Sequence, residues 1–384
     1  MIRTACPDLD CKLRLHKNRM ENDHVISERG GVVENRHKVH ASVVDATGKL
    51  LFYIGDPFRM TLARSTAKPM QALAVLETGG FDLFKFDEAD LALMCASHSS
   101  EERHISRALN MLTKVQGKET NLCCGGHPAL SDSVNRDWIK RGYNPTAVCN
   151  NCSGKHIGML AGSKAIGADI TSYHQSTHPL QSRVKQVVQE LCDLEAEEVK
   201  WGVDGCNLPA PAFPLHYLGR IYAIIASSAD QMEKDGSASA RTQALSRIYH
   251  AMAQYPELVG GEGRFCTVLM QAFQGRLIGK LGADGCYGIG IRASEETVKL
   301  GATGAVGISV KIEDGSIPIL YCAVLEILEQ LGIGSSEMCK ELDVFHHPAI
   351  MNTAGVITGH VIPALKLRAA RLNCPSKTES VGMP

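Results

Sequence analysis

The two ends of the chain carry the same kind of pattern, and this constrains the fold more than any other feature. Residues 37–56 (HKVHASVVDATGKLLFYIGD) form two β-rich runs around a turn at 46–49, which predicts a hairpin. Residues 275–293 and 298–315 are glycine-punctuated and β-like, which again indicates hairpins. We therefore expect one antiparallel sheet that takes strands from both chain ends.

The middle of the chain has a different period. The region of about 85–255 shows mainly helical spacing of apolar residues, and residues 317–332 predict a strong amphipathic helix. A helical region inserted between sheet segments is typical of an α+β fold. The segment 201–215 (WGVDGCNLPAPAFPL) reads instead as short β-like residues followed by a proline-rich loop.

The expected boundaries follow from where the pattern starts and stops. Clear periodicity begins only near Gly30, so we expect residues 1–24 to be a flexible extension, with Met1 or Met20 as the start. Residues 25–367 are predicted to form a single folded unit. Residues 368–384 are predicted to be a flexible tail.

Composition excludes several classes of protein. The 384 residues have a formal net charge of −1, which gives no indication of nucleic acid or an anionic membrane as partner. No apolar run approaches the ~20 residues of a membrane-spanning helix, and the N-terminus lacks the apolar core of a secretory signal. The 14 cysteines are therefore expected to be free thiols in a reducing cytoplasm.

The stretch TLARSTAKPMQALAVLETGG (61–80) contains the first candidate for chemistry. Ser65 precedes Lys68 by about one helical turn, so the two side chains can meet on one face. Pro69 is tolerated only near a helix start, which puts Ser65 at the N-terminal end, where free backbone N–H groups favour an oxyanion. The alternative is an ordinary helix entrance with a solvated lysine.

More distant residues complete a pattern of S-x-x-K, a second serine and a late Lys-x-Gly, as in penicillin-recognising enzymes. Lys280 stands in a Lys-Leu-Gly sequence within a β-like run. The second serine is either Ser97 or Ser131, and each is also explained as a helix cap.

A lysine base must be neutral near pH 7. Free lysine has a pKa near ~10.4, so the pKa of Lys68 would have to fall by ~3 units. Burial and a second cation both act in that direction. We expect Lys280 to be that second cation.

Cysteines supply a separate candidate site. Cys149 and Cys152 form a C-x-x-C pair, which suggests zinc or redox chemistry, but no second such pair follows. Asp204 and Cys206 lie in WGVDGCNLPAPAFPL. Spacing alone favours Cys152 and Cys206 as two buried thiols over a pair of metal ligands.

Five motifs, in order along the chain, resemble one family. They are LARSTAKPMQAL, CASHSSEERHISRALNML, NNCSGKHIGMLAG, VDGCNLPAPAFPL and GKLGADG. The chain resembles the Rhizobium etli type (class 3) L-asparaginases of the asparaginase II family, from about Gly30 to about Leu367. The resemblance implies a serine β-lactamase-like fold, a homodimer, and hydrolysis of L-asparagine to aspartate and ammonia.

The resemblance also implies roles for single residues. Ser65 matches the nucleophile and Lys68 its base, while Ser97, rather than Ser131, matches the second catalytic serine and is partnered by Lys280.

The same resemblance implies a zinc site and a substrate site. The zinc ligands would be Cys152, Lys155 and Cys206 with a water, and Arg64 and Asp204 would lie near the substrate.

Three rival functions stay open at this point. A glutaminase on the same fold differs by one methylene of substrate. A zinc-dependent amidase would use Cys152, Cys206 and a metal-bound water. A non-catalytic zinc or redox-sensing protein would use the same cysteines without turnover.

Overall fold

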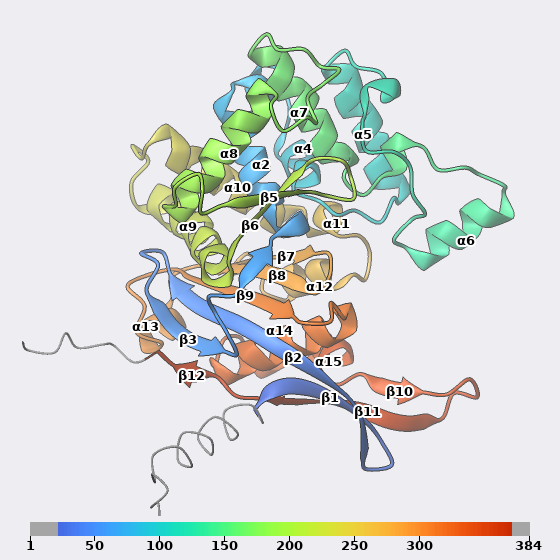
Figure 1. The fold of residues 1–384 in the computed structure, drawn as a ribbon, viewed down its shortest axis with the longest axis vertical. Coiled ribbons are helices and arrows are strands. Elements are labelled where there is room, and N and C mark those ends of the chain that lie inside the picture. Colours follow the sequence, from blue (N-terminus) through green and yellow to red (C-terminus); the bar gives the residue numbers. More distant parts are fainter. Residues whose placement is uncertain (1–21, 371–384) are drawn as a thin grey trace, which may run out of the picture.

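The computed structural model describes residues 22–370, and its central feature is a nine-stranded sheet (Figure 1). Neighbouring strands follow the order β10-β11-β1-β2-β9-β8-β7, and β3 pairs with both β2 and β12. The strands are β1 (Asp23–Arg29), β2 (Val32–Asp45), β3 (Leu50–Ile54), β7 (Leu277–Gly282), β8 (Cys286–Ile291), β9 (Val306–Ile312), β10 (Ala349–Met351), β11 (Ile357–Leu365) and β12 (Arg368–Ala369).

The two chain ends meet inside this sheet. Strand β2 pairs antiparallel with β9 from Val39 opposite Ile312 to Asp45 opposite Val306. The hairpins β2–β3 and β7–β8 are present, but residues 298–315 contain one strand, β9, instead of the expected hairpin. The helices fall mainly between the two groups of strands. The predicted α+β layout, with one antiparallel sheet built from both ends, is therefore confirmed.

The α-helices and short 3-10 helices of the described residues have the following bounds. They are η1 (Arg64–Ala67), α2 (Lys68–Glu77), α3 (Gly80–Leu83), α4 (Glu88–Met94), α5 (Glu102–Lys114), η2 (Glu119–Asn121), α6 (Asp132–Lys140), η3 (Ala147–Cys149), α7 (Ser153–Ala165), α8 (Pro179–Cys192), α9 (Leu215–Lys234), α10 (Ala240–Gln254), α11 (Pro256–Val259), α12 (Phe265–Ala272), α13 (Glu295–Lys299), α14 (Ile317–Gln330) and α15 (Ser336–His346). The predicted amphipathic helix at 317–332 corresponds to α14. In Figure 1 the helices α2, α4, α5, α7 and α8 gather above the sheet, and α6 lies out to the right.

Helices cover both faces of the sheet centre. All seven residues of β9 are buried, and this strand contacts both α9 and α14. A Cβ at Gly307 would lie 1.8 Å from the carbonyl oxygen of Gly219 in α9. Glycine in β9 therefore lets α9 lie directly against the strand, and this close packing fixes the sheet under the helical region.

The sheet begins earlier and ends later than expected. Asp23 and His24 belong to β1, and Arg368–Ala369 forms β12. The polar residues in DHVISER hid this strand, although Asp23 is buried, pairs with Leu365 in β11 and forms an ion pair with Arg368 (Oδ1–Nη2 2.6 Å). Residues 1–21 of the predicted extension and 371–384 of the predicted tail lie outside the described residues.

The proline-rich segment is a strand, which corrects the expected loop. Residues Pro209–Pro214 form β6, which lies between β4 (Met60–Leu62) and β5 (Lys200–Val203) in a three-stranded sheet. The prolines have no N–H to donate, but their carbonyls still accept, as Pro211 does from Ala63 N–H at 2.9 Å. This small sheet leads directly into η1.

Two further findings bear on the composition. Among the helices of residues 22–370, none combines the length and apolar character needed to cross a membrane. The cysteines whose side chains are described form no disulfide.

Candidate active site

A serine hydroxyl lies between two buried lysines. Nζ of Lys68 lies 3.1 Å from Oγ of Ser97, and Nζ of Lys280 lies 2.8 Å from the same oxygen. Lys68 and Lys280 are 0% and 1% exposed, and Ser97 is 6% exposed. The structure thus brings together three of the four predicted catalytic side chains, from positions up to 212 residues apart in sequence (280 minus 68).

Secondary structure explains why the lysines converge. Lys68 is the first residue of α2, with Pro69 in the first turn as the sequence predicts. Lys280 lies in the middle of β7. A Cβ at Gly282 would come within 2.8 Å of the carbonyl oxygen of Ala63, so the glycine of Lys-Leu-Gly allows β7 to approach η1.

The loop after α4 carries Ser97 and is held by its backbone. Ser97 N–H donates to Val259 O at 3.0 Å, and Arg264 Nη1 donates to Ser97 O at 2.8 Å. Sequence reasoning missed Arg264, because GGEGRFC has no pattern that connects it to a serine 167 residues away. Its role is to position the Ser97 segment.

The buried cluster changes the pKa of Lys280. Burial, and then the nearby ammonium of Lys68, lower the pKa of Lys280 to about 7. The amine of Lys280 therefore holds its proton weakly at neutral pH. Ser97 Oγ can then donate its proton to Lys280 while it accepts one from Lys68, which satisfies the hydrogen bonds of the buried hydroxyl.

Ser65 lies at the expected place in the chain but not in this network. It is half-buried in η1, and no hydrogen bond joins its hydroxyl to a residue in the described part of the chain. Lys68 instead donates to Ser97, to Ala96 O and to Asn151 O. Catalytic contacts are often long in the absence of substrate, so this geometry leaves the roles of Ser65 and Lys68 as predictions.

Ser131 is a helix cap, as one reading of the sequence had it. Its Oγ accepts from Val134 N–H at the start of α6. Ser131 forms no hydrogen bond with Lys68 or Lys280.

The three predicted zinc ligands lie together. Lys155 Nζ lies 3.0 Å from Cys206 Sγ, and Cys152 hydrogen-bonds Cys206. That hydrogen bond, followed by the Lys155 charge, lowers the pKa of Cys206 to about 5 in spite of burial. Hydrogen bonding to Cys206 and burial raise the pKa of Cys152 to about 12. The arrangement is a thiolate between a thiol and an ammonium.

Arg64 and Asp204, the predicted substrate contacts, form an ion pair. Arg64 Nε lies 2.8 Å from Asp204 Oδ1, and Arg64 Nη1 also pairs with Asp284. Arg64 has a φ of 51°, an uncommon left-handed conformation for a side chain of this size. Burial acts to raise the pKa of Asp204, but the charge of Lys155 and the hydrogen bond from Arg64 lower it overall. Asp284 was missed by the sequence analysis.

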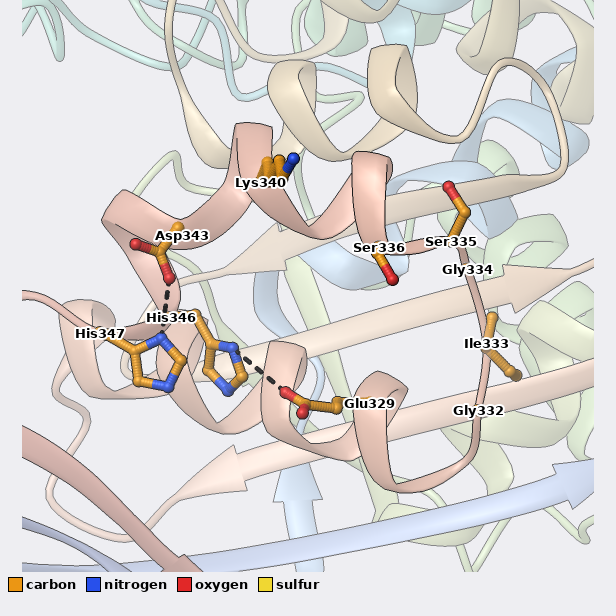
Figure 2. A pocket seen from close by; sticks show the side chains of 10 residues that line it. All are labelled: Glu329, Gly332, Ile333, Gly334, Ser335, Ser336, Lys340, Asp343, His346 and His347. Carbon is orange, nitrogen blue, oxygen red and sulfur yellow. Dashed lines mark hydrogen bonds and ion pairs between the residues drawn. The ribbon is translucent and has the colours of Figure 1, made fainter.

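A second group of possible metal ligands lies elsewhere. The group consists of Glu326, Glu329 and His346. Glu329 and His346 line a pocket of about 470 Å³ between α14 and α15 (Figure 2). Glu326 Oε2 lies 3.1 Å from Nε2 of His346, and Glu329 Oε2 lies 3.6 Å from its Nδ1. Each carboxylate contacts one nitrogen of the His346 ring, so contacts between α14 and α15 account for the group.

The buried amine–hydroxyl cluster points first to a class of protein, an enzyme, since two lysines are rarely buried together without a function. The model of the family described as L-asparaginase II matches residues 25–363. The chain belongs to the L-asparaginase II family, and it is a hydrolase acting on amide C–N bonds. Membership supports L-asparaginase activity on a small-molecule substrate. No sequence among the curated proteins matches the chain.

Proposed function

We propose that this protein is a Rhizobium etli type L-asparaginase that hydrolyses L-asparagine through an acyl-enzyme on Ser65. The observation that carries the proposal is the Lys68–Ser97–Lys280 cluster. Its first member, Lys68, follows the predicted nucleophile Ser65 by three residues. We also propose the serine β-lactamase-like fold, a cytoplasmic homodimer and a zinc site, as the motif resemblance implies.

The cluster offers a way to make Lys68 neutral. A proton passes from Lys68 to Ser97 while the Ser97 proton passes to Lys280, across hydrogen bonds of 3.1 and 2.8 Å. Charge is conserved, because one proton leaves Lys68 and one arrives at Lys280. The low pKa of Lys280, about 7, means that its amine is free to receive this proton at neutral pH.

Neutral Lys68 then removes the Ser65 proton as Ser65 Oγ attacks the side-chain amide carbon of asparagine. Backbone N–H groups at the start of η1, including that of Ser65, hold the oxyanion. The Ser97–Lys280 pair returns a proton to the leaving ammonia, and water hydrolyses the β-aspartyl ester. The α-carboxylate of the substrate pairs with Arg64 and its α-ammonium with Asp204.

The donor set beside the site fits zinc. Cys152, Lys155 and Cys206 are each no more than 4% exposed, and they offer two sulfurs and one amine, with Cys206 already a thiolate by its pKa of about 5. The charge on Cys206 raises the pKa of Lys155 in spite of burial, so metal binding must displace that proton. Bound zinc would supply positive charge that orders the Asp204 segment and helps to seat the charged end of the substrate.

Chelation should therefore affect binding more than chemistry. Treatment with a strong chelator is expected to raise KM for asparagine several-fold with a smaller loss of kcat, because Ser65 and the lysines supply the nucleophile and base. The measurement is steady-state kinetics with metal content followed in parallel, and re-addition of Zn²⁺ is the control. Loss of kcat at saturating substrate would favour the zinc-dependent amidase instead.

Glutamine is expected to be the poorer substrate. The extra methylene shifts the amide carbon away from Ser65, a difference worth about 1–3 kcal/mol, so kcat/KM for asparagine should exceed that for glutamine by roughly 10- to 200-fold. Ammonia release from each amide measures the ratio. A ratio below one would make the enzyme a glutaminase on the same fold.

A further inference from the structure

The guanidinium of Arg64 is shared by two carboxylates that differ in accessibility. Arg64 Nε donates to Asp204 Oδ1 at 2.8 Å, and Nη1 donates to Asp284. The side chain of Asp204 is 11% exposed, whereas that of Asp284 is 71% exposed. Asp204 Oδ1 also accepts Gly205 N–H at 2.8 Å. In the described part of the chain, the Asp284 carboxylate forms a hydrogen bond with Arg64 alone.

The backbone that carries Asp284 is fixed. Asp284 and Gly285 form the turn between β7 and β8, with φ values of 57° and 69°. Lys311 Nζ donates to Asp284 O at 2.7 Å, and Ile312 N–H donates to Gly285 O at 2.8 Å. A Cβ on Gly285 would come 3.0 Å from Gly315. The turn cannot move without losing these contacts, so only the Asp284 side chain is free to leave Arg64.

The donor geometry of arginine limits what Arg64 can bind. A guanidinium presents its five N–H groups in a fixed fork, and a bidentate carboxylate needs two adjacent donors. Nε is held by the buried Asp204, and Nη1 by Asp284. A substrate carboxylate on the outer edge of Arg64 would share Nη1 with the Asp284 carboxylate. The two negative charges would then repel each other at one nitrogen, so binding is strongest once Asp284 has left.

We propose that the Asp284 carboxylate occupies the place of the substrate α-carboxylate on Arg64 and is exchanged for it when an amino acid binds. The exchange keeps two carboxylates on one guanidinium, so the positive charge of Arg64 stays compensated. Asp284 is thus a built-in competitor that sets the affinity for carboxylate-bearing ligands. This inference rests on the proposed role of Arg64 in binding L-asparagine.

Substitution Asp284→Asn tests the competition. Asparagine tolerates a positive φ, so the turn is expected to form, while the neutral amide pairs weakly with Arg64. An exposed ion pair is worth little, so removing the competitor should lower KM for L-asparagine by about two- to fivefold. Asp193→Asn is the matched control, because Asp193 also has a positive φ of 59°, is 81% exposed and faces an arginine, Arg220.

A binding measurement separates this inference from the proposed function. Calorimetric titration of L-aspartate into the Ser65→Ala variant and into the Ser65→Ala, Asp284→Asn double variant measures the affinity for a carboxylate ligand in the absence of turnover. Tighter binding in the Asp284→Asn background supports the competition. Unchanged or weaker binding overturns it, and weaker binding would mean that Asp284 contacts the ligand ammonium instead. Failure of the wild type to release ammonia from asparagine would overturn the proposed function but leave this titration decisive.

Discussion

Ser65→Ala is expected to lower kcat for L-asparagine by at least roughly 10³-fold, because the proposed mechanism forms the acyl bond on the hydroxyl that this substitution removes. The protein should fold normally, since Ser65 is half-buried and its side chain forms no hydrogen bond within the described residues. Ammonia release at saturating substrate measures kcat, and thermal unfolding checks the fold. With a slow ester substrate, the wild type should show an acyl-enzyme mass that Ser65→Ala lacks.

Ser131→Ala is the matched control. Ser131 also begins a helix, and the sequence alone offers it as a candidate for the second serine, but its Oγ caps α6. Loss of the cap should cost about 1 kcal/mol of stability and leave kcat unchanged. Substantial residual kcat in Ser65→Ala, or an acyl-enzyme mass in that variant, would show that Ser65 is not the nucleophile.

Local rules predicted the elements on which the site is built. Pro69 indicated a helix start directly after Ser65, and Lys68 is the first residue of α2. The β-like run around Lys280 is strand β7 of a hairpin. These features depend on backbone preferences of a few adjacent residues, which a single sequence records directly.

The meeting of distant residues could not be derived from spacing. Ser97 and Lys280 are 183 residues apart, and the family resemblance, rather than periodicity, selected Ser97 over Ser131. Arg264 and Asp284 were missed for the same reason, since each acts through one long-range contact. Strand β6 was missed because its prolines oppose a strand in local rules, whereas their carbonyls still pair in the sheet.

The electrostatic prediction needed the fold as well. The sequence suggested two lysines that disfavour each other's charge, with Lys68 as the neutral one. The geometry lowers the pKa of Lys280 to about 7, first through burial and then through Lys68. Proton exchange through Ser97 therefore decides whether Lys68 or Lys280 is neutral. A substitution at Lys280 tests this exchange.

Lys280→Met is expected to lower kcat/KM by roughly 10²- to 10⁴-fold, the usual cost of losing a proton-transfer group. In the wild type, kcat/KM should fall about tenfold per pH unit below pH 7, because Lys280 then keeps its proton and cannot take one from Lys68. The variant should lose this acid limb near pH 7. The pKa of Lys280 falls from 10.5 to about 7 on folding, so the folded chain holds this proton less firmly than the unfolded chain does. Below pH 7 this lowers the free energy of unfolding of the wild type by about 5 kcal/mol. The variant lacks the amine and should therefore be more stable in acid.

Profiles of kcat/KM from pH 5 to 9 and urea unfolding at pH 6 provide the measurements. Lys311→Met is the matched control, because Lys311 lies on β9 in the same sheet and burial also lowers its pKa, yet it bonds to Asp284 O and Ile312 O rather than to Ser97. Lys311→Met should keep the acid limb near pH 7. An unmoved pH profile in Lys280→Met would exclude Lys280 as the proton acceptor and leave burial of Lys68 as the remaining way to produce a neutral base.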